Sequence, residues 1–362
     1  MALFYDDILP SSNDDEMLNH VQRRPQIFRE RVNYFETMDD LDFFTRFRLT
    51  EITVETLLIQ IEESLIHATE RNNAIPPRIQ LLLALRYYAT GWHLIAAGDF
   101  SGVSKTSAHR IVHRVTAAIA GLTREDIKIP STEAKVTAAQ LDFYAIARFP
   151  KFISALDCTH VQVQSFGEDD AEVFRIRKGY FSINVQAKCN SGMKFTSIVA
   201  RWPEAVHGST IFRNSRLCAR LEAGEFRDAF ILGDGGYALK NYLITPLNNP
   251  VTEAERLFNE SQIRTRNKIE CTFGIWKRRF PCLATRMRFK VDHVLPVIVA
   301  TAVLHNKARL ATEDLPPDEP RLNGHWDEVL NEDLHNRGNL PVDDGNARRN
   351  IIAHFQSLID QQ

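Results

Sequence analysis

Phe152-Ile-Ser-Ala-Leu-Asp157 and Ala229-Phe-Ile-Leu-Gly-Asp234 are two short apolar runs, and each of them ends in an aspartate. Runs of this length and composition predict buried β-strands. Three further apolar or alternating runs lie at 161–163, 181–187 and 195–202. Helical patterns are found at about 209–222, 263–280 and 293–310. This order of strands and helices predicts an α/β domain over residues 150–310, with one central sheet covered by helices.

Helical periodicity dominates the chain before residue 150. Residues 1–77 form a charged helical region that ends at a Pro-Pro pair, and residues 78–148 form a second helical region. Within the second region, 92–119 has the pattern of helix, turn and helix, with Ser104 as the cap of the second helix. Such an element can place its N-terminal end in a DNA major groove. A helical hairpin that serves packing alone is the alternative.

The end of the chain has a different composition. Residues 313–344 contain ten acidic residues, four prolines and only two basic residues. A segment of this kind buries too little apolar surface to fold by itself. We therefore predict an acidic, poorly ordered tail over residues 311–362.

Composition and charge exclude several classes of protein. Hydrophobic residues make up 44% of the chain and charged residues 25%, which is typical of a globular protein rather than a disordered one. A net charge of −2 argues against a surface that is basic throughout, so any contact with nucleic acid must come from local patches. The longest apolar run, 294–304, is too short to span a bilayer, and the first residues do not resemble a secretory signal. Five cysteines without a CxxC pair indicate free thiols in a reducing compartment.

Three carboxylates, Asp157, Asp234 and Glu270, form the candidate catalytic site. The two aspartates follow buried strands, where a rigid sheet holds side chains at an open edge. On a helix through 263–280, Glu270 lies within roughly 40° of Arg266 and Lys277, beside an apolar stripe. Carboxylate oxygens suit Mg²⁺ or Mn²⁺. Two such ions about 4 Å apart activate water and stabilise charge during phosphodiester hydrolysis. The alternative is that each aspartate is only a turn or capping residue among 46 acidic residues.

The residues around these acids resemble the motifs of the PIF/Harbinger transposase superfamily, which is of the DDE type. The first acidic motif is matched by Asp157-Cys-Thr-His160, by Val161-x-Val163 and by the segment from Arg177-Lys-Gly-Tyr180 to Gln186. The other motifs are matched by Leu232-Gly-Asp234-Gly-Gly-Tyr237, Thr245-Pro-Leu247, Arg266-Asn-Lys-Ile-Glu270 through Phe280, and Leu304-His-Asn306. The likeness covers residues 78 to about 307 and is greatest to the domesticated, Harbinger transposase-derived nucleases of animals.

The resemblance implies a ribonuclease H-like fold, in which a mixed sheet is flanked by helices. It also implies a divalent metal cation, Mg²⁺ or Mn²⁺, at Asp157, Asp234 and Glu270, and DNA as the substrate. The expected reaction is endonucleolytic hydrolysis by an activated water, without a covalent enzyme intermediate. Family members act in the nucleus, with the cytoplasm as a second compartment, and a separate Myb-like protein often supplies DNA binding and nuclear import. No membrane association is expected, and the oligomeric state is not predicted.

One position departs from the family's pattern. After its Trp-Pro segment the family usually has an aspartate, sometimes counted as a further metal ligand, where this chain has Gly208. Glu204 and His207 are the nearby side chains that would have to compensate. The departure supports a second hypothesis: a domesticated transposase with reduced catalysis that serves as a DNA-binding or regulatory scaffold. A third hypothesis is an RNA-directed nuclease on the same fold.

Two basic segments are candidate DNA contacts. The helix after Ser104 carries Lys105, Arg110 and Arg114 with no acidic residue nearby. The segment 264–290 has nine Lys or Arg residues and a single acid, Glu270. Its candidate contacts are Arg266, Lys277, Arg278 and Arg279. Cations at such positions would bind phosphates independently of base sequence, and a solvated basic face is the alternative.

Overall fold

The structure is a computed structural model of the chain, and it describes residues 31–67, 73–164, 181–203, 206–226, 228–315 and 346–361. The predicted motif residues Arg177 to Tyr180, the side chain of Glu204 and most of the acidic segment 313–344 lie outside the described residues. No described helix is long and apolar enough to cross a membrane.

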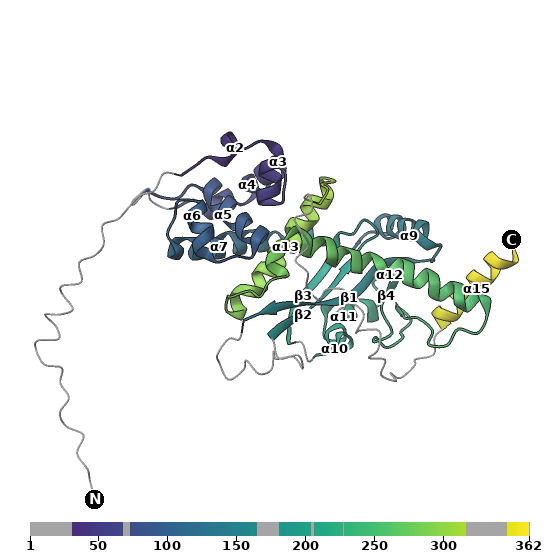
Figure 1. Cartoon of the computed structure of the whole chain (residues 1–362). Helices are drawn as coiled ribbons and strands as arrows, with labels where there is room; N and C mark the ends of the chain where they lie inside the picture. Colours follow the sequence, from purple (N-terminus) through teal and green to yellow (C-terminus); the bar gives the residue numbers. More distant parts are fainter. Residues whose placement is uncertain are drawn as a thin grey trace, which may run out of the picture.

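A five-stranded mixed sheet forms the centre of the molecule (Figure 1). Its strands are β1 (Phe152–Val163), β2 (Phe181–Cys189), β3 (Phe195–Pro203), β4 (Phe230–Leu232) and β5 (Leu243–Ile244). They lie in the order β3-β2-β1-β4-β5. The pairs β1–β2 and β2–β3 are antiparallel, whereas β4 runs parallel to β1 and to β5. The α/β class and the single sheet flanked by helices agree with the expectation from the sequence.

The first strand corrects one sequence-based prediction. Residues 152–157 and 161–163 were expected as two runs, with Asp157 at a strand end, but β1 is continuous through both. The polar residues between them stay in the strand because β2 pairs with β1 from Ala155 to Val163. The parallel partner β4 is much shorter, and its last pair is Ala155 with Leu232. Asp157 and Asp234 each lie two residues beyond this pair, so the register brings them to the same edge.

Helices cover both faces of the sheet. On one face lie α12 (Glu253–Arg279) and α13 (Val291–Leu310), which pack on β1, β2 and β3. The opposite face carries α10 (Gly208–Arg213) and α11 (Arg216–Glu222), where Phe212 and Leu217 join Leu156 in a separate apolar cluster. Alternation along the strands therefore divides the side chains of β1 and β2 between two cores. The predicted single helix at 209–222 is divided into α10 and α11.

A capping box begins the long helix that carries Glu270. The Thr252 side chain accepts from the Glu255 backbone N–H, and the Glu255 carboxylate accepts in return from the Thr252 N–H. Cations in its last turn suit the negative end of the helix dipole. A 3₁₀ turn, Pro281–Leu283, then ends the helix. The helix thus begins ten residues before the predicted segment 263–280 and crosses the sheet as one rigid element (Figure 1).

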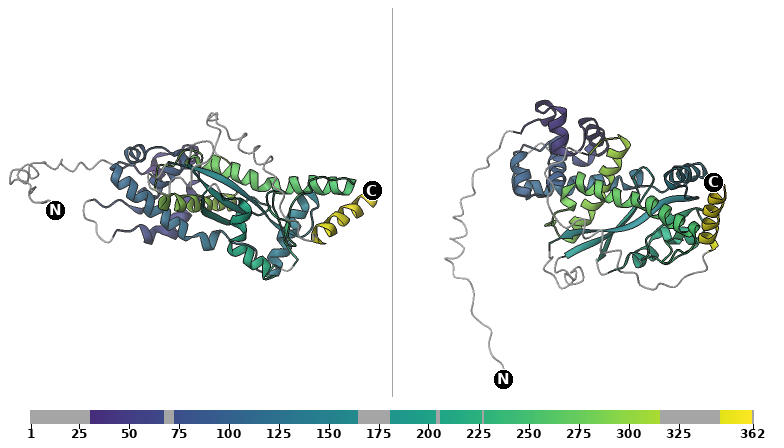
Figure 2. Two further views of the ribbon diagram at one scale, coloured as in Figure 1. Left: turned by 90° about the horizontal axis from the view of Figure 1, so that it is seen from below. Right: turned by 45° about the vertical axis from the view of Figure 1, so that its right-hand side comes forward.

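The N-terminal helices group at one end of the sheet (Figure 2). They are α2 (Tyr34–Thr37), α3 (Asp40–Phe47), α4 (Glu51–Leu65), α5 (Pro77–Thr90), α6 (Leu94–Phe100), α7 (Lys105–Gly121) and α8 (Thr123–Asp126). Ser104 caps α7 by accepting from the Ser107 N–H, as predicted. α7 packs against α13, and one apolar cluster runs from α3–α7 to the sheet face under α12 and α13. The helical region and the sheet therefore share a core.

The C-terminal segment corrects another prediction. Residues 311–362 were expected to be poorly ordered, but Asn346–Asp360 form the helix α15. Ile351 and Phe355 of α15 are buried against Phe143 of α9 (Glu133–Ala147) and Phe258 of α12. An amphipathic face at helical spacing gives this helix the apolar surface that packs on α9 and α12. The helix lies at the end of the sheet opposite the N-terminal helices (Figure 2).

Candidate active site

The two strand-borne aspartates are held by their own backbone. One carboxylate oxygen of Asp157 accepts from the Cys158 backbone N–H at 2.8 Å. Asp234 lies in the turn after β4, where its Oδ1 accepts from the Gly236 N–H at 3.1 Å. Both side chains are only partly exposed. Each carboxylate is therefore fixed on one side and keeps its remaining lone pairs for a ligand.

Glu270 joins them through an arginine on the same helix. Arg266 of α12 donates from Nη1 to Asp157 Oδ2 at 2.7 Å, and its Nη2 lies 2.5 Å from Glu270 Oε1. Arg266 and Glu270 are four residues apart, so both project from one face of the helix toward β1. The Arg266 and Asp157 side chains are each 15% exposed. A single guanidinium thus links the sheet edge to the helix.

Electrostatics in this cluster are dominated by crowded negative charge. Burial first, and then the charges of Asp234 and Glu270, raise the pKa of Asp157 to about 7, although Arg266 opposes the shift. Burial and the Glu270 charge also raise the pKa of Asp234, against Arg266 and the backbone hydrogen bonds. Burial alone would lower the pKa of the Arg266 guanidinium, but the three carboxylates raise it. The cluster therefore contains three carboxylates and a single guanidinium, so acidic groups outnumber basic ones.

A divalent cation fits this cluster by charge and donor type. Three carboxylates that repel one another around one guanidinium would gain from a further positive charge, and their hard oxygens suit Mg²⁺ or Mn²⁺. Within the described residues, no three His, Cys, Asp or Glu side chains already converge as a ready ligand set. Arg266 accounts for this because its guanidinium lies between Asp157 and Glu270.

Replacing Arg266 with methionine is expected to test its role as the resident cation. Without the guanidinium the carboxylates are uncompensated, so the metal-free variant should lose about 3 kcal/mol of stability. A bound cation replaces part of the missing charge, so Mn²⁺ should raise the unfolding temperature of the variant more than that of the wild type. Thermal unfolding in EDTA and in Mn²⁺ measures both. A smaller metal-induced shift in the variant would contradict this role.

Gly208 is enclosed by a polar network under the site. Gln186 of β2 donates from Nε2 to the Gly208 carbonyl at 2.8 Å and to the Tyr237 hydroxyl at 3.1 Å. The Cys158 thiol lies 3.4 Å from the same hydroxyl. A Cβ on Gly208 would lie 2.6 Å from Tyr237 Oη and 2.9 Å from Cys158 Sγ. The space that an acidic side chain would need is therefore filled.

Introducing the missing acid by Gly208→Asp is expected to destabilise the protein rather than restore a ligand. Overpacking of this kind costs about 1–3 kcal/mol. Tyr237 follows Asp234 by three residues, so cleavage should fall as well. Gly274→Asp is the matched control, because no atom lies within 4 Å of its added Cβ. An active Gly208→Asp protein with unchanged unfolding temperature would contradict the tight packing.

The candidate DNA contacts on α7 lie on its exposed side. Lys105, Arg110 and Arg114 are all exposed. Arg114 also lies within 3.3 Å of the His67 ring nitrogens and 3.4 Å from Gln80 Oε1. α6 and α7 pack together with α5, as in a helical hairpin. All three cations are open to solvent, and DNA contact by them stays a prediction.

The second basic segment is largely used inside the protein, which corrects the candidate list. Arg279 is fully buried and Arg266 pairs with carboxylates, so neither can be offered to DNA in this structure. The Lys277 ammonium donates to Thr159 Oγ1 at 2.7 Å and to the His160 carbonyl at 2.9 Å. Burial lowers its pKa to about 8. Of the predicted contacts here, Arg278 is exposed. Helical periodicity places Arg266 and Lys277 on the side of Glu270 but does not show which face the sheet covers.

Several residues beneath the site had no predicted role. Gln186, Cys158 and Tyr237 all belong to segments that resemble family motifs, and that membership was the available signal. Their mutual contacts depend on the pairing of Cys158 with Gln186 across β1 and β2. His207, one of the two residues considered as a substitute for the missing acid, is exposed.

Comparison with known proteins agrees with these motifs. Residues 156–306 match the family described as DDE superfamily endonuclease. The chain is 31% identical over 278 residues to "Putative nuclease HARBI1" of Bos taurus and 30% identical to its Homo sapiens counterpart; both alignments cover 72% of this chain and 79% of the relative. It is also 22% identical to "Protein ALP1-like" of Arabidopsis thaliana, over 68% of this chain and 64% of that protein. No solved structure matches the chain.

The matched span contains Asp157, Asp234 and Glu270, together with the Gln186 and Tyr237 that support them. The chain belongs to the PIF/Harbinger superfamily of DDE-type transposases and transposase-derived endonucleases.

Proposed function

We propose that the chain is a divalent-metal-dependent endonuclease that hydrolyses phosphodiester bonds in DNA at Asp157, Asp234 and Glu270. One observation carries the proposal: the Arg266 guanidinium pairs with Asp157 of β1 and Glu270 of α12, and Asp234 in the turn after β4 is close enough for the charges of Arg266 and Glu270 to shift its pKa. The mixed sheet with strand order β3-β2-β1-β4-β5 and helices on both faces supports a ribonuclease H-like fold. The relatives named as nucleases support the reaction class.

The chain's own residues prepare the site in three ways. The Cys158 and Gly236 amides fix the two aspartates, so little reorganisation is needed when a ligand enters. Arg266 holds Glu270 toward β1 and keeps a positive charge between Asp157 and Glu270. When bound, a divalent cation supplies the Lewis acid that activates water and stabilises charge on the phosphate. No side chain is assigned as a covalent nucleophile.

DNA would bind through the exposed cations of α7 and Arg278. We propose that the helical region before residue 150, including α6 and α7, contacts the DNA backbone and that residues 150–310 cleave it. Lys105, Arg110 and Arg114 are three exposed cations of α7, with Lys105 at the first position of the helix. Three phosphate contacts give a slope of about −2.7 for log affinity against log salt. A variant with alanine at all three positions should lack these contacts, so its slope of log affinity against log salt should be less steep by about 2.7.

A cleavage assay tests the proposed function. Purified protein with Mg²⁺ or Mn²⁺ is expected to cut duplex DNA, to stop in EDTA, and to lose at least about 10²-fold in rate in Glu270→Gln. Parallel RNA substrates separate a DNA nuclease from an RNA-directed one. Since the family implies a Myb-like partner, the assay is run with and without such a protein. Equal cleavage by wild type and Glu270→Gln would refute the assignment.

A noncatalytic scaffold is the second candidate, and the enclosure of Gly208 favours it. The position that usually supplies an acid is sealed by Tyr237 and Cys158. A scaffold would bind DNA with the α7 cations but would show no carboxylate-dependent stabilisation by metal.

We also propose that the protein acts in the nucleus, with the cytoplasm as a second site. Imaging of the tagged chain with and without the Myb-like partner tests this.

A further inference from the structure

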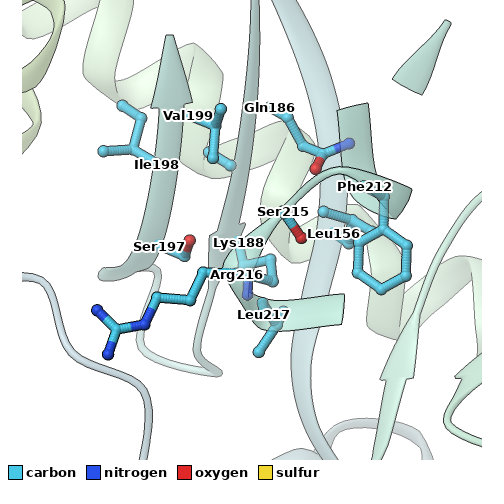
Figure 3. Close-up of a pocket in the computed structure, with 11 residues that line it drawn as sticks. Leu156, Gln186, Lys188, Ser197, Ile198, Val199, Phe212, Ser215, Arg216 and Leu217 are labelled. Atoms are coloured by element: carbon cyan, nitrogen blue, oxygen red, sulfur yellow. The ribbon is translucent and has the colours of Figure 1, made fainter. Parts of the chain in front are cut away.

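A cavity of about 220 Å³ lies between the sheet and the two short helices α10 and α11 (Figure 3). Its walls come from β1, β2, β3 and the segment 212–217. Leu156, Phe212 and Leu217 provide apolar surface, and all three belong to the core on this face. Asp157 contacts Arg266 of α12, which lies on the other face, so the cavity is separate from the carboxylate cluster.

A buried lysine ends in this cavity without a partner. Lys188 of β2 pairs with Leu156 across the sheet, and only 3% of the residue is exposed. Its side chain extends into the space between the strands and the helices (Figure 3). Its Nζ atom has no hydrogen-bond partner. A buried amine of this kind costs stability unless a ligand satisfies it.

The lining of the cavity holds two basic side chains, Lys188 and Arg216, and no acidic side chain among the described residues. Burial first, and then the charge of Arg220, lower the pKa of Lys188 well below its ordinary value. The exposed Arg216 forms one side of the cavity at its solvent edge, and the Ser197 and Ser215 hydroxyls lie nearby (Figure 3). Cationic and hydroxyl donors beside an apolar wall are complementary to an oxyanion with a small organic substituent.

We infer that this cavity binds a phosphate group, with Lys188 and Arg216 as its charged partners. The phosphate would belong either to inorganic phosphate or to a mononucleotide, because the enclosed volume is below that of a drug-sized pocket. An anion there accepts a hydrogen bond from the Lys188 amine, favours its protonated form and balances Arg216. Gln186 lines the same cavity and also donates to Gly208 and Tyr237, so an occupant would touch the network beneath the carboxylates.

Calorimetry on the full chain tests the inference, with inorganic phosphate and deoxyadenosine 5′-monophosphate as probes at constant ionic strength. Wild type should bind at least one probe, and Lys188→Met should weaken binding at least about tenfold. Arg216→Gln should weaken it less because Arg216 is exposed. The exposed Lys135→Met is the matched control and should bind as wild type does. Tighter binding of the mononucleotide identifies that source, whereas equal binding identifies the phosphate alone.

Lys188→Met removes an unsatisfied buried amine, so the variant should fold and its unfolding temperature should be equal or higher. Three results would overturn the inference. The first is no binding of either probe to wild type at millimolar concentration. The second is wild-type affinity in a folded Lys188→Met protein. The third is full competition by a short DNA duplex, which would assign the anion to the DNA-binding surface instead.

Discussion

Replacing Asp157 with asparagine is expected to lower metal-dependent DNA cleavage by about 10³-fold or more. The change removes the negative charge that a divalent cation needs at the sheet edge, and several kcal/mol of transition-state stabilisation depend on that cation. Cleavage rates in Mn²⁺ measure the loss. Asp228→Asn is the matched control, because Asp228 is an exposed acid that pairs with Lys151 away from the cluster. A variant that retains wild-type activity would remove Asp157 from the mechanism.

The same substitution is expected to stabilise the metal-free protein at alkaline pH. The folded-state pKa of Asp157, about 7, is above its value in the unfolded chain, which is about 4. The folded protein therefore binds more protons between these values, and its stability falls as pH rises through this window. Above pH 7 this loss of stability is fully present, and replacing Asp157 with asparagine removes it. Unfolding in EDTA at pH 5 and pH 8 should show the wild type losing more stability than the variant, in which the raised pKa of Asp234 remains. Parallel curves for both proteins would contradict the raised pKa.

Replacing Arg279 with leucine is expected to cause the largest loss of stability. The guanidinium is 1% exposed and donates to the carbonyls of Arg48, Glu313 and Asp314 at 2.7, 3.0 and 2.7 Å. Nη1 also lies 3.3 Å from the Glu313 carboxylate, which accepts in turn from the Thr50 amide and hydroxyl. Removing one partner of a buried ion pair costs about 3–5 kcal/mol.

Urea unfolding of Arg279→Leu measures that loss, and Arg278→Leu is the control at the next position. Arg278 is exposed, so its replacement should change stability by no more than about 0.5 kcal/mol. DNA affinity should fall more in Arg278→Leu than in Arg279→Leu, because of these two residues only Arg278 is placed to reach a phosphate. If both variants unfolded like the wild type, the proposed link between α12, α4 and the end of α13 would be wrong.

The fold class could be predicted because it depends on local patterns, and the same patterns single out the three acids as candidates. Apolar runs identified the strands, and the flanking motifs identified the family. The environment of Asp157 could not be predicted, since its place inside β1 depends on pairing with β2, from Ala155 with Cys189 onward. Its proximity to Asp234 depends on the register of β1 with a strand more than seventy residues later. Strand β5, only two residues long, carries no periodic signal.

The sequence pattern also could not predict which cations of the segment 264–290 are buried. Arg279 lies in a basic helix turn, and its partners Arg48 and Glu313 are 231 and 34 residues away along the chain. α15 was missed because the acidic segment before it dominated the composition, although Ile351 and Phe355 are four residues apart at helical spacing. The sequence shows that Gly208 lacks an acid, but only the structure shows that Tyr237 and Cys158 fill the space.

Calorimetric titration of Mn²⁺ tests most directly whether Asp157, Asp234 and Glu270 share a cation. Wild type is expected to show saturable binding. The variants Asp157→Asn, Asp234→Asn and Glu270→Gln should each bind at least about tenfold more weakly, whereas the Asp228→Asn control should match wild type. Identical binding curves for the wild type and all three site variants would contradict the shared site, whatever nuclease activity the preparation showed.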